Sequence, residues 1–219
     1  MEKFTAKNNR GMARSIFSRC HPEYSRGMTY VELVVVLGIM GVLSSVVMFN
    51  HGKFQGKIDI KNLANDIALK VVEAQKSSMS GKWNSATTLP NWKPSYGLYF
   101  NIAGNSNADK FIYFSDLDND DICDPPACTP SYTLTNEVLD IVNITKGNTV
   151  SSIEVFGTGS CPATVTNLTI LFKRPNSSPA ITSTPPLGCS VSYIAINVTS
   201  PKGVNSKIKM YSSGRVQIN

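Results

Sequence analysis

The feature that most constrains the fold of this sequence is a long apolar run near its N-terminus. No charged residue occurs from Leu33 to Phe49. Once Met28 to Val31 are included, the segment approaches the roughly 20 residues that a membrane-spanning helix needs. The run is too long and too uniform for a core strand, since strands usually have about 3–10 residues. We therefore expect a helix that enters a membrane.

The residues before the apolar run carry most of the positive charge. The 219-residue chain has a formal net charge of +6, and six basic and two acidic residues precede Met28. A basic flank followed by an apolar segment is the layout of an export signal, with the basic side retained in the cytoplasm. The rest of the chain is close to neutral, with 15 basic and 13 acidic residues. Its net charge alone therefore does not indicate a nucleic-acid partner.

The candidate cleavage point lies before the apolar run. It is Gly27, because the sequence lacks a small-x-small cleavage site after the run. Processing there would make Met28 the new N-terminus and leave the helix on the mature protein. One acid, Glu32, lies near the start of the run. A carboxylate inside a membrane helix costs about 2.5–3.5 kcal/mol on insertion scales, so we expect Glu32 to have a partner.

These residues resemble the class III signal of type IV prepilins and type II secretion pseudopilins. The resemblance rests on Arg26-Gly27, then Met28-Thr29-Tyr30-Val31-Glu32, then an unbroken apolar helix. It implies that a dedicated peptidase cuts after Gly27 and methylates Met28. It also implies that Glu32 is the recurrent acid of the family, paired during assembly with the Met28 amine of a neighbouring subunit. The alternative is a single-pass anchor with an interfacial acid.

An amphipathic helix is predicted beyond the apolar run. Apolar residues recur there at three- and four-residue steps and form one stripe: Ile60, Leu63, Ala64, Ile67, Val71 and Ala74. The polar segment 50–53 contains Gly52 and marks the membrane boundary and a candidate hinge. We therefore expect a leader over 1–27, a transmembrane helix over 28–52 and its amphipathic continuation over 53–80.

A β-rich head is predicted over 81–219. Short β-branched or aromatic runs are bounded there by turn residues; they are Tyr96–Ile102, Lys110–Ser115, Ser151–Phe156, Asn167–Phe172, Tyr193–Val198 and Lys207–Met210. Leu134–Ile144 is a weaker strand candidate. The Pro- and Ser-rich stretch Arg174–Pro186 predicts an exposed loop. The expected fold class is α+β, with a long N-terminal helix packed on an all-β, sandwich-like head.

The end of the chain carries a second resemblance. Met210–Ile218 predicts a terminal hairpin with Ser213-Gly214 in the turn, and is similar to the close of the GspH/FimT group of minor pilins and pseudopilins. That group has a long helix packed against a β-sandwich. Some FimT-type proteins bind DNA through a basic C-terminal motif, for which the candidates here are Lys207, Lys209 and Arg215. The alternative for these cations is a solvated strand face.

The number of cysteines in the predicted mature chain is consistent with export. Cys20 would leave with the leader, and the remaining even set suits an oxidising compartment: Cys123, Cys128, Cys161 and Cys189. Three pairings are open, among them Cys123 with Cys128 and Cys161 with Cys189. A four-thiolate zinc site is the rival.

An acidic stretch follows the predicted strand Lys110–Ser115. Its carboxylates at positions one, three, five and nine resemble the first part of an EF-hand calcium loop: Asp116, Asp118, Asp120 and Asp124. Position six, normally Gly, is Asp121, and position twelve, normally Glu, is Ala127. We predict a calcium site that needs a more distant acid. The alternative is an exposed acidic turn.

We expect a structural subunit and not an enzyme. Both histidines, His21 and His51, lie outside the predicted head, so a nucleophile there would have no histidine base. The resemblance implies a minor type IV pilin or type II secretion pseudopilin in the bacterial cytoplasmic membrane, with its head periplasmic or extracellular. Its partners would be other such subunits, the prepilin peptidase, the inner-membrane assembly platform and lipid. The alternative is a DNA- or surface-binding minor pilin of a competence or adhesion pilus.

Overall fold

The computed structural model of the 219-residue chain describes residues 27–85, 93–104, 108–123 and 137–219, without the side chains of residues 49 and 50. Residues 1–26 of the predicted leader, Asp124 and Cys128 lie outside these residues. The chain divides into two compact units, Met1–Ser45 and Val46–Asn219.

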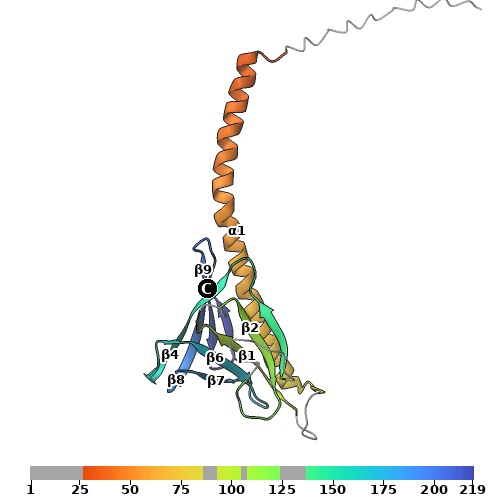
Figure 1. The fold of residues 1–219 in the computed structure, drawn as a ribbon, viewed down its shortest axis with the longest axis vertical. Helices are drawn as coiled ribbons and strands as arrows, with labels where there is room; N and C mark the ends of the chain where they lie inside the picture. Colours follow the sequence, from red (N-terminus) through yellow and green to blue (C-terminus); the bar gives the residue numbers. More distant parts are fainter. Residues whose placement is uncertain (1–26, 86–92, 105–107, 124–136) are drawn as a thin grey trace, which may run out of the picture. The chain divides into compact units, whose positions relative to one another are not determined.

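One long helix, α1 (Tyr30–Ser80), precedes all the strands (Figure 1). Thr29 caps its start, because the Glu32 N–H donates a hydrogen bond to Thr29 Oγ1 at 3.4 Å. The helix ends at Gly81, whose φ of 62° places it in the left-handed region that favours glycine at this position. The backbone is helical throughout residues 50–53, so α1 continues through the predicted boundary.

The N-terminal part of α1 is long and apolar enough to cross a membrane. None of the residues in its most apolar window is buried within the protein. A helix that leaves such side chains exposed needs a cover other than its own chain, and lipid is the cover that the composition predicts.

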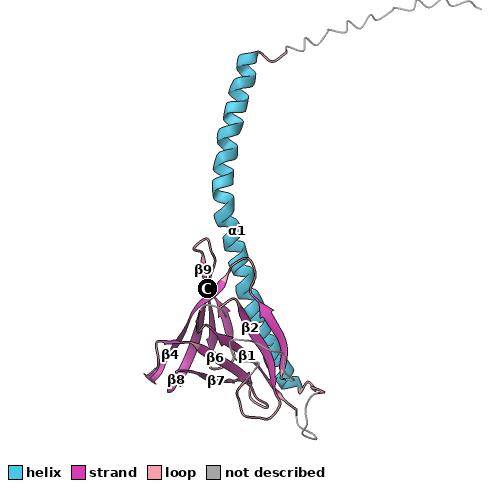
Figure 2. Cartoon of the chain, in the orientation of Figure 1, coloured by secondary structure: helices cyan, strands magenta, loops and turns pink. Residues whose placement is uncertain are grey.

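Two antiparallel five-stranded sheets form the β-rich head (Figure 2). The order in sheet A is β3-β2-β1-β6-β7, and in sheet B it is β10-β9-β8-β4-β5. The strands are β1 (Ser95–Asn101), β2 (Lys110–Asp116), β3 (Val138–Asn143), β4 (Thr149–Ser160), β5 (Thr164–Val165), β6 (Asn167–Phe172), β7 (Pro179–Thr184), β8 (Gly188–Thr199), β9 (Asn205–Tyr211) and β10 (Val216–Ile218). The α+β class, the predicted strands and the terminal hairpin are confirmed.

The prediction of an exposed loop over Arg174–Pro186 is wrong. β7 lies within this stretch and pairs with β6, so that Ile181 faces Ile170 in the register. The strand forms the edge of sheet A, where proline and serine are tolerated because one side of the backbone is not needed for a ladder. Ile181 also packs against the main core. Tertiary pairing thus overrode a composition typical of loops.

The main core joins α1 to both sheets. The whole predicted apolar stripe of the helix lies in it, and Ala64, Ile67 and Ala74 are fully buried. Hydrogen bonds reinforce the packing: Ser78 Oγ donates to the Phe172 carbonyl at 2.5 Å, and Tyr113 Oη donates to Ser77 Oγ at 3.1 Å. The predicted apolar stripe of the helix is therefore buried in the core.

A second, smaller cluster covers the other face of sheet A. Its buried members come from four strands, β1, β2, β3 and β6, and from the segment after β2: Tyr99, Ile112, Phe114, Cys123, Val138 and Leu171. Cys123 closes the segment after β2 and Val138 opens β3. Burial of Cys123 fixes the end of the described acidic stretch against sheet A.

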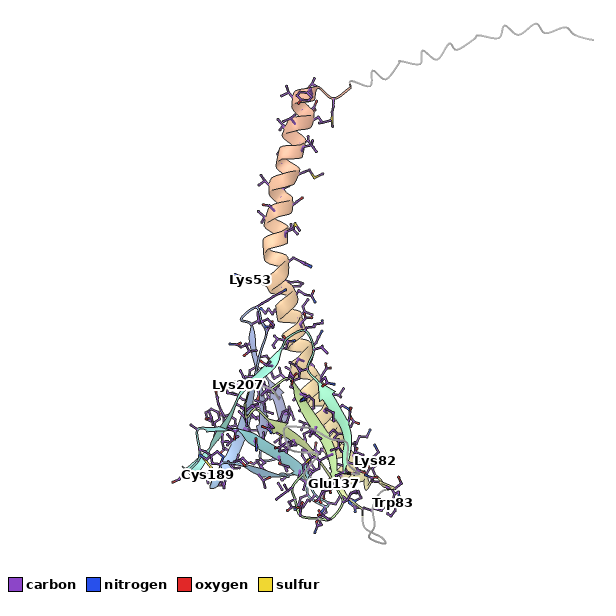
Figure 3. The ribbon with its side chains drawn as sticks, in the orientation of Figure 1. Lys53, Lys82, Trp83, Glu137, Cys189 and Lys207 are labelled. Atoms are coloured by element: carbon purple, nitrogen blue, oxygen red, sulfur yellow. A yellow bond between two sulfur atoms is a disulfide. The ribbon has the colours of Figure 1, made fainter. Side chains whose placement is uncertain are left out.

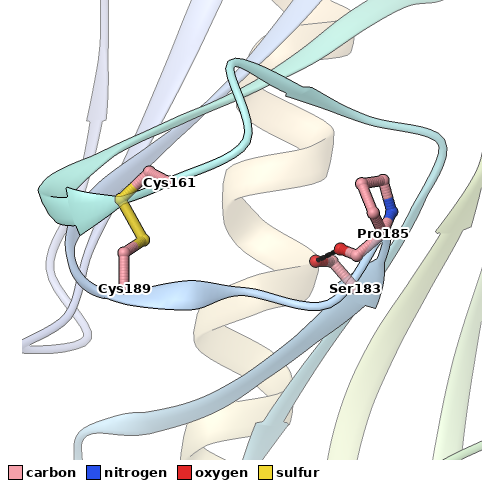
Figure 4. The surroundings of a disulfide bond; sticks show 4 residues. All are labelled: Cys161, Ser183, Pro185 and Cys189. Carbon is pink, nitrogen blue, oxygen red and sulfur yellow. Dashed lines mark hydrogen bonds between the residues drawn. A yellow bond between two sulfur atoms is a disulfide. The ribbon is translucent and has the colours of Figure 1, made fainter.

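A disulfide joins Cys161, directly after β4, to Cys189 in β8 (Figure 4). In the same region Ser183 Oγ donates a hydrogen bond to the Pro185 carbonyl at 2.6 Å. The predicted Cys161–Cys189 bridge is confirmed, and it excludes the four-thiolate zinc site because two of the thiols are oxidised. Cys123 is 2% exposed, but Cys128 lies outside the described residues, so a bridge between these two stays a prediction.

Two leucine-sized side chains of α1 provide a test of the helix packing. Ile67 is 0% exposed in the core, whereas Leu69 is 67% exposed. We expect Ile67→Ala to lower the free energy of unfolding by about 2–5 kcal/mol, because it leaves a cavity. Leu69→Ala should change it by less than about 0.5 kcal/mol. Denaturant unfolding of the detergent-solubilised chain, followed by near-UV circular dichroism, measures both. Equal effects would contradict the packing of this face on the sheets.

Candidate functional site

The acidic loop, residues Asp116 to Cys123, follows directly from an inner strand of sheet A. β2 lies between β1 and β3, and its last residue, Asp116, faces Ser95 of β1 in the register. β3 pairs with β2 only as far as Phe114, and Asp116 lies beyond that pairing, yet it is 0% exposed. A carboxylate is thus buried where the loop begins.

Short-range hydrogen bonds shape the acidic loop. Asp116 Oδ1 accepts from the Asn119 N–H at 2.7 Å, and Asp120 Oδ1 accepts from the Ile122 N–H at 2.8 Å. Asn119 and Asp121 adopt φ values of 69° and 70°, in the left-handed region. Asp121 occupies the sixth loop position, where EF-hand loops use glycine, and its backbone has the left-handed conformation that glycine favours.

Glu137 reaches the acidic loop from the start of β3. Its carbonyl accepts from the Ser115 N–H at 2.8 Å, which places it beside the end of β2. Its Oε1 accepts from the Leu117 N–H at 2.9 Å, and the residue is only 7% exposed. Figure 3 labels Glu137 among the strands of the head.

Three carboxylates converge at this point. Asp116, Asp118 and Glu137 each present one oxygen within 4.8 Å of the others. The sequence prediction included Asp116 and Asp118, but its third member, Asp120, does not belong to this group, and Asp124 lies outside the described residues. Glu137 was missed because it lies far along the chain. The antiparallel pairing of β2 and β3 places Glu137, the residue before β3, beside the end of β2. A prediction of this pairing would have found Glu137.

The electrostatics at Asp116 are unfavourable for a bare carboxylate. Its Oδ2 is buried and has no hydrogen-bond partner among the described residues. Burial is the main cause that raises the pKa of the Asp116 carboxyl to about 6, and repulsion from the carboxylates of Asp118, Asp120 and Asp121 contributes to this rise. The hydrogen bond from the Asn119 N–H acts in the opposite direction and lowers this pKa. Lys173 lies nearby and forms an ion pair with Asp121.

Aromatic rings form a row on sheet B. Phe156, Tyr193 and Tyr211 face one another across β4, β8 and β9. The ring centroids of Phe156 and Tyr193 are 4.5 Å apart, and those of Tyr193 and Tyr211 are 5.7 Å apart. These side chains point away from the core, since the alternate residues Ile208 and Met210 are buried.

Three cations lie over this row, and together they form the basic–aromatic face. Lys207 Nζ is 6.0 Å from the Phe156 ring centroid and Lys209 Nζ is 5.5 Å from that of Tyr193. The Arg215 guanidinium carbon is 4.2 Å from the Tyr211 ring centroid. Lys207 Nζ also donates a hydrogen bond to Glu154 Oε2 at 3.0 Å, and this ion pair lowers the pKa of the Glu154 carboxyl. The three predicted cations share one face, and the rings between them were missed from the sequence.

The predicted processing and assembly residues lie at the start of α1. Gly27, Met28 and Thr29 are exposed and non-helical, and Glu32 is exposed in the first turn. Thr29 and Glu32 have the spacing of a capping box, and the Glu32 N–H donates to Thr29 Oγ1. Helix capping is therefore an alternative to the predicted pairing as a role for the Glu32 side chain.

Comparison with known proteins gives no match: no protein-family model, no curated protein and no solved structure matches the chain.

Proposed function

We propose that this protein is a minor type IV pilin or type II secretion pseudopilin. In this role it is a structural subunit of a filament that assembles through its N-terminal helix after leader cleavage. The observation that carries the proposal is the position of Gly27, Met28 and Glu32 directly before an apolar helix whose later part packs on a β head. Before assembly the subunit spans the bacterial cytoplasmic membrane once, with its head periplasmic or extracellular.

The exposed apolar surface of α1 supports assembly through this segment. Its side chains have no cover within the chain, so neighbouring helices can replace lipid around them. Glu32 lies in the first turn, where the helix dipole favours negative charge. An amine at Met28 of an adjacent subunit would neutralise it in the membrane, where an unpaired charge is costly. Prepilin peptidase, the inner-membrane assembly platform and companion subunits are the partners that this role requires.

The processing site gives the most direct test. Gly27→Leu should block cleavage, because the peptidase of this class acts at a glycine. The wild-type chain, expressed with its host peptidase, should begin at Met28 and carry one added methyl group. Intact-mass measurement of protein extracted from the membrane determines both the N-terminal residue and the added methyl group. A mature chain that begins after Phe49 would contradict the proposal.

Three variants at the helix start separate subunit pairing from helix capping. Glu32→Gln keeps a capping-box side chain but removes the charge, Glu32→Ala removes both, and Thr29→Ala removes only the cap. We expect both Glu32 variants to enter filaments about tenfold less than wild type, which corresponds to about 1.4 kcal/mol of lost pairing.

Thr29→Ala should be incorporated normally, and all three variants should insert into the membrane. Immunoblots of sheared filaments, normalised to the membrane fraction, measure this. If Glu32→Gln behaves like wild type while Glu32→Ala and Thr29→Ala fail, capping and not charge pairing explains Glu32.

The basic–aromatic face favours a second candidate function, DNA binding by the head of a competence pilus subunit. Stacked rings give a platform for unpaired bases, and the cations above them can contact phosphates. This arrangement supports the DNA-binding alternative more strongly than the cations alone, because rings and cations alternate on one surface.

A charge-matched pair of variants tests this second function. Lys209→Gln with Arg215→Gln should weaken single-stranded DNA binding by at least about tenfold and reduce its salt slope by about 1.4. Lys57→Gln with Lys61→Gln removes the same charge from exposed positions of α1 and should leave binding unchanged. Fluorescence anisotropy of the detergent-solubilised chain with a labelled oligonucleotide measures both. If both pairs of variants lost the same affinity for single-stranded DNA, the basic–aromatic face would not be a specific DNA-binding site.

A further inference from the structure

We propose that Asp116, Asp118 and Glu137 bind one calcium ion, which ties the end of β2 to the start of β3. Two observations carry this site independently: the convergence of three carboxylates and the buried acceptor of Asp116 that no hydrogen bond satisfies. The proposal does not depend on the filament role.

The spacing of the carboxylates suits a single ion. Two oxygens bound to one calcium at 2.3–2.6 Å can be no more than about 5 Å apart. One oxygen from each of Asp116, Asp118 and Glu137 lies within 4.8 Å of the others. Small side-chain rotations would bring all three onto a common centre. Ordered water and loop carbonyls are the usual donors for the remaining positions of a calcium shell.

The buried oxygen is the stronger argument for a ligand. Asp116 is 0% exposed, and its Oδ2 has no hydrogen-bond partner among the described residues. Native proteins rarely leave such an acceptor unsatisfied, and a bound cation would satisfy it. The other carboxylates around it add repulsion that a cation would convert into attraction.

The donor set selects calcium among the common cations. All three donors are carboxylate oxygens, which are hard ligands, whereas zinc prefers nitrogen and sulfur. Magnesium demands near-ideal octahedral geometry and gives up its water reluctantly, so an irregular loop suits it less than calcium. Asp121, at the sixth position, already has the left-handed conformation of a calcium loop.

Glu137 supplies what the linear motif lacks. In an EF-hand loop the last ligand is a glutamate at position twelve, where this chain has Ala127. Here the glutamate comes from the neighbouring strand and is nearly buried, at 7% exposed. An ion held by Asp118 and Glu137 would close the chain between them into a loop, and so would stabilise the edge of sheet A where β3 lies.

The rival explanation is that Lys173 alone neutralises the acidic loop. It forms an ion pair with Asp121, outside the group of three carboxylates. Asp121→Asn is therefore a matched control, since it removes one charge from the same loop and asparagine tolerates the left-handed backbone. Asp109→Asn serves as a second control, because Asp109 is exposed and directly precedes β2 at its opposite end.

The test uses the full chain in detergent, freed of metal with EGTA. Calcium at about 10 mM should raise its melting temperature by about 3–10 °C relative to EGTA, while the same concentration of magnesium should have less than half this effect. Isothermal titration calorimetry should give one site per chain, with a dissociation constant between about 0.1 and 1 mM, as in other extracellular calcium modules.

Variants decide whether the three carboxylates are the ligands. Glu137→Gln and Asp118→Asn should each lose at least about tenfold in calcium affinity, and both controls should keep wild-type affinity. Asp118 is exposed, so its variant reports on binding even if Glu137→Gln fails to fold. The proposal is overturned if calcium neither shifts the melting temperature nor releases or absorbs heat, if magnesium acts equally well, or if Asp121→Asn costs as much affinity as Asp118→Asn.

Discussion

The packing of one stripe of α1 against both sheets is the interaction on which the rest of the head depends. Ala64, Ile67 and Ala74 are fully buried there, and small alanines let the helix approach the strands closely. Removing this stripe would expose the inner faces of two sheets at once, because helix and strand residues belong to one continuous core. The helix therefore connects the head to the apolar segment and is also part of the head's core.

Burial of sheet A on both faces explains where chemistry collects in the head. The main core takes one face and the smaller cluster around Ile112 and Phe114 takes the other. β2 ends in these surroundings, and its last residue, Asp116, is buried there. A buried carboxylate needs compensation, so the fold creates a demand for positive charge at the acidic loop. Sheet B, by contrast, keeps an outward face of rings and cations.

The two candidate sites use charge differently. At the acidic loop, carboxylates gather around a buried oxygen and the field favours a small hard cation. On the basic–aromatic face, Lys209 and Arg215 lie over rings and leave a surface suited to an anionic polymer. One chain would therefore carry both an ion that stabilises its head and a surface that contacts a ligand. The proposed assembly through α1 needs neither of them.

The sequence alone determined the features that are local in the chain. Apolar periodicity gave the long helix and its buried stripe, and β-branched runs gave most of the strands, because both patterns repeat over a few residues. Only the tertiary structure decided that Arg174–Pro186 holds an edge strand and that Phe156, Tyr193 and Tyr211 form a row. It also decided that Glu137, and not Asp120, joins Asp116 and Asp118. The physical reason is that strand pairing sets these contacts between residues far apart in the chain, and no spacing within the sequence reports it.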